Sequence, residues 1–86
     1  MITISQKEVN TLFVILYKTI HYDENLSCTF NKYTPVAICD TLYHLDHTVM
    51  NFRERYLYNK VYIAEVPINE LWEQRLETYI VMEEVL

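Results

Sequence analysis

Apolar side chains recur every three or four positions between Thr41 and Tyr58, the spacing that places them on one face of an α-helix. The stripe consists of Leu42, Leu45, Val49, Phe52 and Tyr56. Asp40 stands just before this segment, and its carboxylate can accept hydrogen bonds from the backbone N–H groups that the first helical turn leaves without partners. The pattern therefore predicts a helix over 41–58 with Asp40 as its N-cap.

Two short apolar runs on either side of this helix are typical of β-strands. Residues 36–39 include β-branched side chains, and Pro35 holds the preceding residue, Thr34, in extended backbone. Residues 60–66 are similar in character and end at Pro67. The pattern predicts one strand before the helix and another after it.

Residues 12–22 are compatible with two structures. Helical spacing is found at Val9, Leu12, Phe13, Leu16, Tyr17 and Ile20. Ser5 and Glu8 have the spacing of a capping box, which favours a helix. The segment is nevertheless apolar nearly all round and rich in strand-forming residues, and a helix without a polar face is difficult to bury in 86 residues. We favour a strand, which a turn at 23–25 leads into a partner strand at 28–33.

A second helix is predicted over 69–82. Asn69 can cap it, and Glu70 and Glu73 fall in its first turn, where the helix dipole favours negative charge. Its core-facing residues would be Trp72, Leu76, Tyr79 and Ile80.

Together these elements predict an α+β fold of one domain, residues 1–86, with a small antiparallel-leaning sheet of three to four strands and two helices packed on one face. If residues 12–22 were helical, the alternative would be an all-α three-helix bundle. A small sheet leaves its edges exposed, and the eight tyrosines supply side chains suited to contact with another chain. We therefore expect a homodimer.

The composition excludes several classes of function. The chain contains no glycine, so it has neither a P-loop nor a dinucleotide-binding loop, both of which need backbone that approaches phosphate closely. A formal charge of −5 opposes general attraction to nucleic acid or to an anionic membrane. Because we recognise no signal peptide or membrane-spanning run, and two cysteines are too few for a disulfide framework, we expect a cytoplasmic protein with free thiols.

One segment combines cations with aromatic rings. It contains Arg53, Arg55, Tyr56, Tyr58 and Lys60. Cations that neutralise phosphate, next to rings that stack on bases, are typical of sites for single-stranded nucleic acid. The competing interpretation is a solvated helix end, because the helix dipole favours basic residues there and Glu54 dilutes the positive charge.

Acidic residues fall near one face of the second predicted helix. They are Glu70, Glu73, Glu77 and Glu84. Such a row can dock on a basic protein surface by electrostatic complementarity, although it is more often the solvated side of an amphipathic helix.

Cys39, His44 and His47 are close in sequence and are the candidates for chemistry. On a helix the two histidines would stand one turn apart and could share a metal ion with Cys39 or Cys28, and Cys39 could act as a nucleophile. The chain has neither a CxxC pair nor an HExxH motif, and a thiol within an apolar strand behaves as a small hydrophobic group. We expect polar flank positions for the histidines, no cofactor and no enzymatic activity.

Three stretches carry a resemblance: residues 13–17 (Phe-Val-Ile-Leu-Tyr), residues 34–41 (Thr-Pro-Val-Ala-Ile-Cys-Asp-Thr) leading into the helix, and residues 60–66 (Lys-Val-Tyr-Ile-Ala-Glu-Val). This pattern resembles small uncharacterised accessory proteins common in phage genomes. The resemblance implies an accessory, counter-defence role and transfers no catalytic residue.

Taken with the acidity and the aromatic content, these observations predict a non-enzymatic protein that binds and modulates or inhibits a host or cognate protein. The alternatives are a nucleic-acid-binding regulator that uses the segment from Arg53 to Lys60, and a small metal- or thiol-dependent enzyme.

Overall fold

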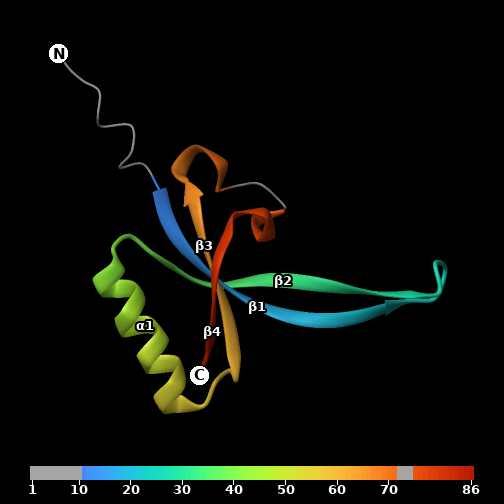
Figure 1. Ribbon diagram of the computed structural model, residues 1–86, viewed down its shortest axis with the longest axis horizontal. Helices are drawn as coiled ribbons and strands as arrows, with labels where there is room; N and C mark the ends of the chain where they lie inside the picture. The colour runs from blue at the N-terminus through green and yellow to red at the C-terminus, as the bar shows by residue number, and fades with distance from the viewer. Residues whose placement is uncertain (1–10, 72–74) are drawn as a thin grey trace.

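The computed structural model describes residues 11–71 and 75–86, which form four β-strands and one α-helix (Figure 1). The elements follow the order β1 (Thr11–Asp23), β2 (Cys28–Cys39), α1 (Leu42–Arg55), β3 (Lys60–Pro67), two 3₁₀ turns (Ile68–Glu70 and Leu76–Tyr79) and β4 (Ile80–Val85). The strands form one antiparallel sheet in the order β2–β1–β3–β4. In the part of the chain that the structure describes, no helix is long and apolar enough to cross a bilayer.

The predicted α+β fold with a small sheet is confirmed, and the three-helix alternative is wrong. Residues 12–22 lie within β1, where Val14 and Leu16 belong to the core on one face of the sheet and Ile15 to the core on the other. All three side chains are fully buried. Burial on both faces explains why the centre of this strand, residues 14–16, lacks the polar alternation of a half-exposed strand. Ser5, Glu8 and Val9, which supported a helix, lie outside the described residues.

The turn after β1 forms where the sequence predicts it. Asp23 Oδ1 accepts hydrogen bonds from the backbone N–H groups of Asn25, at 2.9 Å, and Leu26, at 3.3 Å. Ser27 takes the left-handed conformation, with φ of 52°, that glycine often supplies in turns. The local hydrogen bonds of Asp23 thus help this glycine-free chain to reverse direction.

The strands predicted at 28–33 and 36–39 are two halves of the single strand β2. Pro35 stands inside it, opposite Leu16, and the register shifts by one residue at this point, so Val36 forms a bulge. Proline is tolerated on edge strands and at bulges, because its missing N–H does not remove a hydrogen bond between strands there. Pro35 therefore interrupts the regular pairing without ending the strand.

Helix α1 forms as predicted, but both of its ends differ from the prediction. Its N-cap is Thr41 and not Asp40: the Thr41 hydroxyl accepts a hydrogen bond from the backbone N–H of His44 at 3.2 Å. The helix ends at Arg55, because Tyr56 adopts a left-handed conformation with φ of 55°. The backbone N–H groups of Tyr56 and Leu57 then bond the carbonyls of Arg53 and Phe52, which forms a Schellman motif.

The second helix predicted over 69–82 is wrong. Two 3₁₀ turns and the strand β4 occupy its described part. Ile80–Val85 pairs with β3, with Ile63 opposite Met82 and Ala64 opposite Ile80, so the sheet uses residues that the local pattern assigned to the end of a helix. Trp72 and Glu73 lie outside the described residues.

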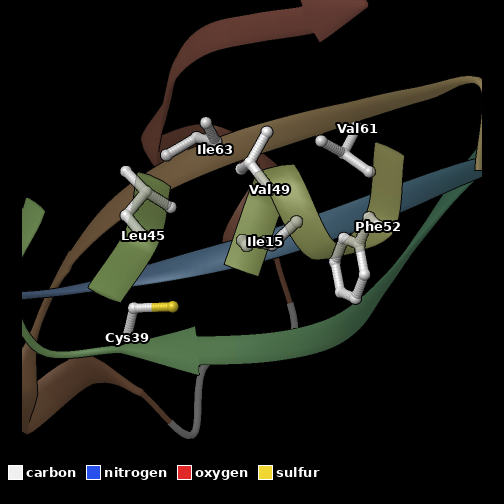
Figure 2. Close-up of a cluster of buried hydrophobic side chains, with 7 residues drawn as sticks. All are labelled: Ile15, Cys39, Leu45, Val49, Phe52, Val61 and Ile63. Carbon is white, nitrogen blue, oxygen red and sulfur yellow. The ribbon is translucent and has the colours of Figure 1, made fainter. Parts of the chain in front are cut away.

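The core has two layers, one on each face of the sheet. In the first, shown in Figure 2, side chains of α1 meet the sheet; its buried residues are Ile15, Cys39, Leu45, Val49, Phe52, Val61 and Ile63. In the second, Leu71, Leu76, Tyr79 and Ile80 pack against the opposite face, over a cluster of Val14, Leu16, Tyr62, Ala64 and Val66. The prediction that two helices pack on one face is therefore corrected, because α1 covers one face and the C-terminal turns cover the other.

We call the part of the molecule that contains the two core layers the body. Beyond the body, β1 and β2 continue together as a two-stranded ribbon (Figure 1). We call residues 19–32 the arm. Its pairs run from Thr19 opposite Lys32 to Asp23 opposite Cys28, and both core clusters are drawn from residues outside it.

Candidate functional site

The basic–aromatic segment predicted from the sequence lies at the junction of α1 and β3. Arg53 stands on the last turn of α1, Tyr56 caps the helix, and Lys60 begins β3. Tyr58 is held inward: its ring makes an edge contact with Phe52, at a centroid distance of 5.1 Å. Tyr56 is the opposite case, since 91% of its surface is exposed.

The structure adds two residues to this segment that sequence reasoning missed. The ring of Tyr17, on β1, lies 4.7 Å from that of Tyr58, and Lys18 Nζ lies 5.4 Å from the centre of the Tyr62 ring. An open hollow of about 460 Å³ is lined by Tyr17, Arg53, Tyr56, Leu57, Tyr58, Asn59 and Leu86. A smaller hollow of about 270 Å³ is lined by Tyr17, Lys18, Asn59, Lys60 and Tyr62.

Carboxylates of β4 offset the positive charge beside these hollows. Lys60 Nζ lies 3.0 Å from Glu83 Oε2, and this hydrogen bond, together with the negative charge of Glu83, raises the pKa of Lys60. Arg53 Nη2 lies 3.8 Å from Glu84 Oε2. Two cations of the basic–aromatic segment are thus already paired within the chain.

The predicted row of acidic residues is wrong for the residues that the structure describes, because they do not share one helix face. Glu70, at the end of a 3₁₀ turn, accepts a hydrogen bond from the Tyr79 hydroxyl. Glu77 accepts one from Arg75 Nε at 3.2 Å, and Glu84 lies on β4 beside Arg53. Glu73 is outside the described residues.

Cys39, His44 and His47 border one open hollow of about 600 Å³, but their side chains are engaged separately. The Cys39 thiol is buried and donates to Thr48 Oγ1 at 3.5 Å, and the His47 ring lies against Tyr43. His44 Nδ1 donates to Asp40 Oδ1 at 2.6 Å, which lowers the pKa of Asp40. Within residues 11–71 and 75–86, no three His, Cys, Asp or Glu side chains stand close enough together to hold a metal ion.

The sequence predicts that an exposed sheet edge meets another chain, and one of the two outer edges of the sheet runs along the arm. Its exposed apolar side chains are Ile20 (68%), Tyr22 (61%), Leu26 (71%) and Phe30 (47%). The outer edge of β2 has no strand neighbour in the described part of the chain. Tyrosine contributes less to this edge than the composition suggests, because Tyr33 packs edge-on against the buried Tyr62.

Comparisons of the chain with protein families, with curated proteins and with solved structures find no match.

Proposed function

We propose that this is a non-enzymatic accessory protein that binds a partner protein through the outer edge of β2 in the arm. The observation that carries the proposal is the exposure of Leu26 and Phe30 on a ribbon that lies outside both core clusters. Apolar side chains in this position do not stabilise the core, and exposed apolar groups that cluster on one element mark contact surfaces.

The partner that fits this edge is an extended protein segment. Backbone N–H and C=O groups along residues 28–34 can pair with a strand of another protein, the binding mode called β-strand addition. Pro35 and the bulge at Val36 end this edge toward the body. Because Lys32 is the only charged residue of β2, we expect the partner segment to be apolar opposite Phe30 and neutral or acidic near Lys32.

We expect binding to modulate or inhibit the partner, in agreement with the resemblance to phage accessory proteins. Cys28 and Cys39 are free thiols, which is consistent with the reducing cytoplasm as the place where the partner is met. We further propose a homodimer as the working unit.

Site-specific photocrosslinking tests this function. A photoreactive residue is placed at position 30 and, as a control, at position 54, an exposed site on α1. In the native cell we expect a discrete protein adduct from position 30 that Lys32→Glu diminishes. Adducts of equal yield from both positions, or none from position 30, would contradict the proposal.

One observation favours a second function, nucleic-acid binding, because Tyr17 and Lys18 enlarge the basic–aromatic surface around Arg53 and Lys60. The pairing of these two cations with Glu84 and Glu83 opposes it. This function predicts binding to a thymidine oligonucleotide that falls steeply with salt. Unchanged affinity in the Arg53→Ala, Arg55→Ala double variant would remove it.

A further inference from the structure

Two of the three histidines of the chain stand one helical turn apart near the start of α1. They are His44 and His47, and side chains three positions apart on a helix have Cβ atoms about 5–6 Å from one another. Both side chains are exposed, and both border the open hollow of about 600 Å³ between the end of β2 and the helix. Two imidazole rings placed in this way can reach one small ligand from solution.

The contacts of Tyr43 show that the two rings lie on the same side of the helix. The Tyr43 ring lies 4.7 Å from the His47 ring and 5.6 Å from the His44 ring, measured between ring centroids. A contact between rings does not use the lone pairs of the imidazole nitrogens, so these remain available to a ligand.

Asp40 determines which nitrogen of His44 is available. His44 Nδ1 donates to Asp40 Oδ1 at 2.6 Å, so in the neutral ring Nε2 carries the free lone pair. Metal-binding histidines are held in this way in proteins, with a carboxylate that accepts from the ring nitrogen that does not bind the ion. This hydrogen bond is independent of the helical spacing, and both observations point to a metal ion.

We propose that His44 and His47 bind one Zn²⁺ ion, with His44 Nε2 and a ring nitrogen of His47 as its protein ligands and with Asp40 as the positioning residue of His44. Imidazole nitrogen is a preferred ligand of zinc, whereas Mg²⁺ and Ca²⁺ prefer oxygen. Zinc in proteins is usually bound by four ligands, so water completes the coordination at the two other positions.

The site differs from the cluster that the sequence suggests, because Cys39 takes no part in it. The Cys39 thiol is buried and donates to Thr48 Oγ1 at 3.5 Å. In the described ranges, 11–71 and 75–86, no three such side chains are close enough to share an ion, so this site has two protein ligands. Two ligands bind more weakly than the four of a structural zinc site, and we expect a dissociation constant in the micromolar range.

The site requires a folded chain, because helical spacing is what brings the two histidines together. An ion that binds the folded chain and not the unfolded chain stabilises the fold. Zn²⁺ should therefore raise the urea concentration at which the protein unfolds. The site is also separate from the proposed partner surface, since α1 and the tip of the arm lie at opposite sides of the molecule (Figure 1).

Isothermal titration calorimetry with Zn²⁺ tests the site in the full-length chain. All proteins carry Cys28→Ser, because the exposed Cys28 thiol of the arm can bind zinc by itself. His44→Ala and His47→Ala each remove one ligand, and His21→Ala is the matched control, because His21 is the third histidine and is exposed on the arm. We expect one ion per chain, a loss of affinity of about tenfold or more in each of the first two variants, and no change in the control. Mg²⁺ should not bind.

Nitrogen-15 NMR of the histidine rings supplies the second measurement, and it needs no change to the proposed ligands. Zn²⁺ should shift His44 Nε2 and one nitrogen of His47 in the same titration and leave the resonances of His21 in place. Asp40→Ala should reduce the fraction of His44 that carries its proton on Nδ1 and weaken zinc binding about tenfold. Asp40→Asn should recover part of this loss, because its amide oxygen can still accept from Nδ1.

Several outcomes would overturn the proposal. Absence of binding at millimolar Zn²⁺ would overturn the site, and so would equal affinities of the three histidine variants. A loss in only one of His44→Ala and His47→Ala would show that the two rings do not share an ion. An Asp40→Ala variant with wild-type affinity would remove the positioning role of Asp40. Partner binding is measured separately, by the crosslink from position 30.

Discussion

Glu84, on β4, places Oε2 3.8 Å from Nη2 of Arg53, on the last turn of α1. The sequence predicts these two residues in separate binding surfaces, Glu84 in an acidic one and Arg53 in a basic one. Their proximity, with that of Lys60 and Glu83, joins the two surfaces into one mixed-charge region of the body. Exposed ion pairs of this kind contribute little to stability, but they reduce the charge available to a ligand. This is why we propose the arm, and not this region, as the surface that binds a partner.

The contact between His44 and Asp40 predicts a titration. Because the hydrogen bond from His44 stabilises the ionised carboxylate, the pKa of Asp40 lies below its ordinary value of 3.8. The stability that this contact contributes is present above that ordinary value and is lost as the pH falls through the lower, folded-state pKa. Carbon-13 NMR of the Asp40 carboxyl should show the pKa rise toward 3.8 in His44→Ala. The same pKa in both proteins would show that the hydrogen bond does not form in solution.

The burial of β1 on both faces predicts a sharp contrast along one hairpin. Ile15→Ala removes buried methyl groups between α1 and the sheet, so we expect it to lower the free energy of unfolding by about 2–5 kcal/mol. Leu26→Ala, at the exposed tip of the arm, should change it by less than about 0.5 kcal/mol. Urea unfolding followed by circular dichroism measures both. Comparable losses would mean that the arm is packed and not free.

The identity of the helix cap can be measured directly. Thr41→Ala removes the acceptor for the His44 backbone N–H, and we expect a loss of about 1 kcal/mol in the free energy of unfolding. Asp40→Ala should cost less, because the Asp40 carboxylate accepts from the His44 side chain instead. The reverse order of the two losses would restore Asp40 as the cap.

Tyr56 predicts a stabilising substitution. A residue with a Cβ atom pays roughly 1–2 kcal/mol in the left-handed conformation, and glycine avoids most of this penalty. Because the Tyr56 side chain is almost fully exposed, Tyr56→Gly should raise the free energy of unfolding by up to about 1 kcal/mol. Tyr56→Ala, which keeps the Cβ atom, is the control. Equal stabilities of the glycine and alanine variants would argue against the left-handed cap.

The sequence predicts those elements whose signal is local. The helical spacing of apolar residues in α1 is visible in the sequence because Leu45, Val49 and Phe52 face the core. The strand β3 is visible as a short apolar run that ends at proline. β4 could not be predicted in this way. Its residues, Ile80–Val85, are extended because they pair with β3, whose sequence lies about 20 residues earlier, and no local pattern records that pairing.

The candidate surfaces show the same limit. Arg53, Tyr56 and Lys60 were found from their local composition, whereas Tyr17 and Lys18 join them only because β1 passes beside the start of β3. The acidic row failed because it assumed a helical period over 69–82. The arm itself follows from strand lengths, since β1 continues seven residues past the end of its pairing with β3.

Quantitative affinity capture from the native cell tests the central claim, that the arm binds a partner protein, most directly. Bait proteins are the wild type, Phe30→Asp on the arm, and Glu54→Lys on α1, each first shown by circular dichroism to be folded. We predict one protein that wild type and Glu54→Lys recover equally and that Phe30→Asp recovers at least tenfold less. Equal recovery by all three baits, or a loss with Glu54→Lys alone, would contradict the account.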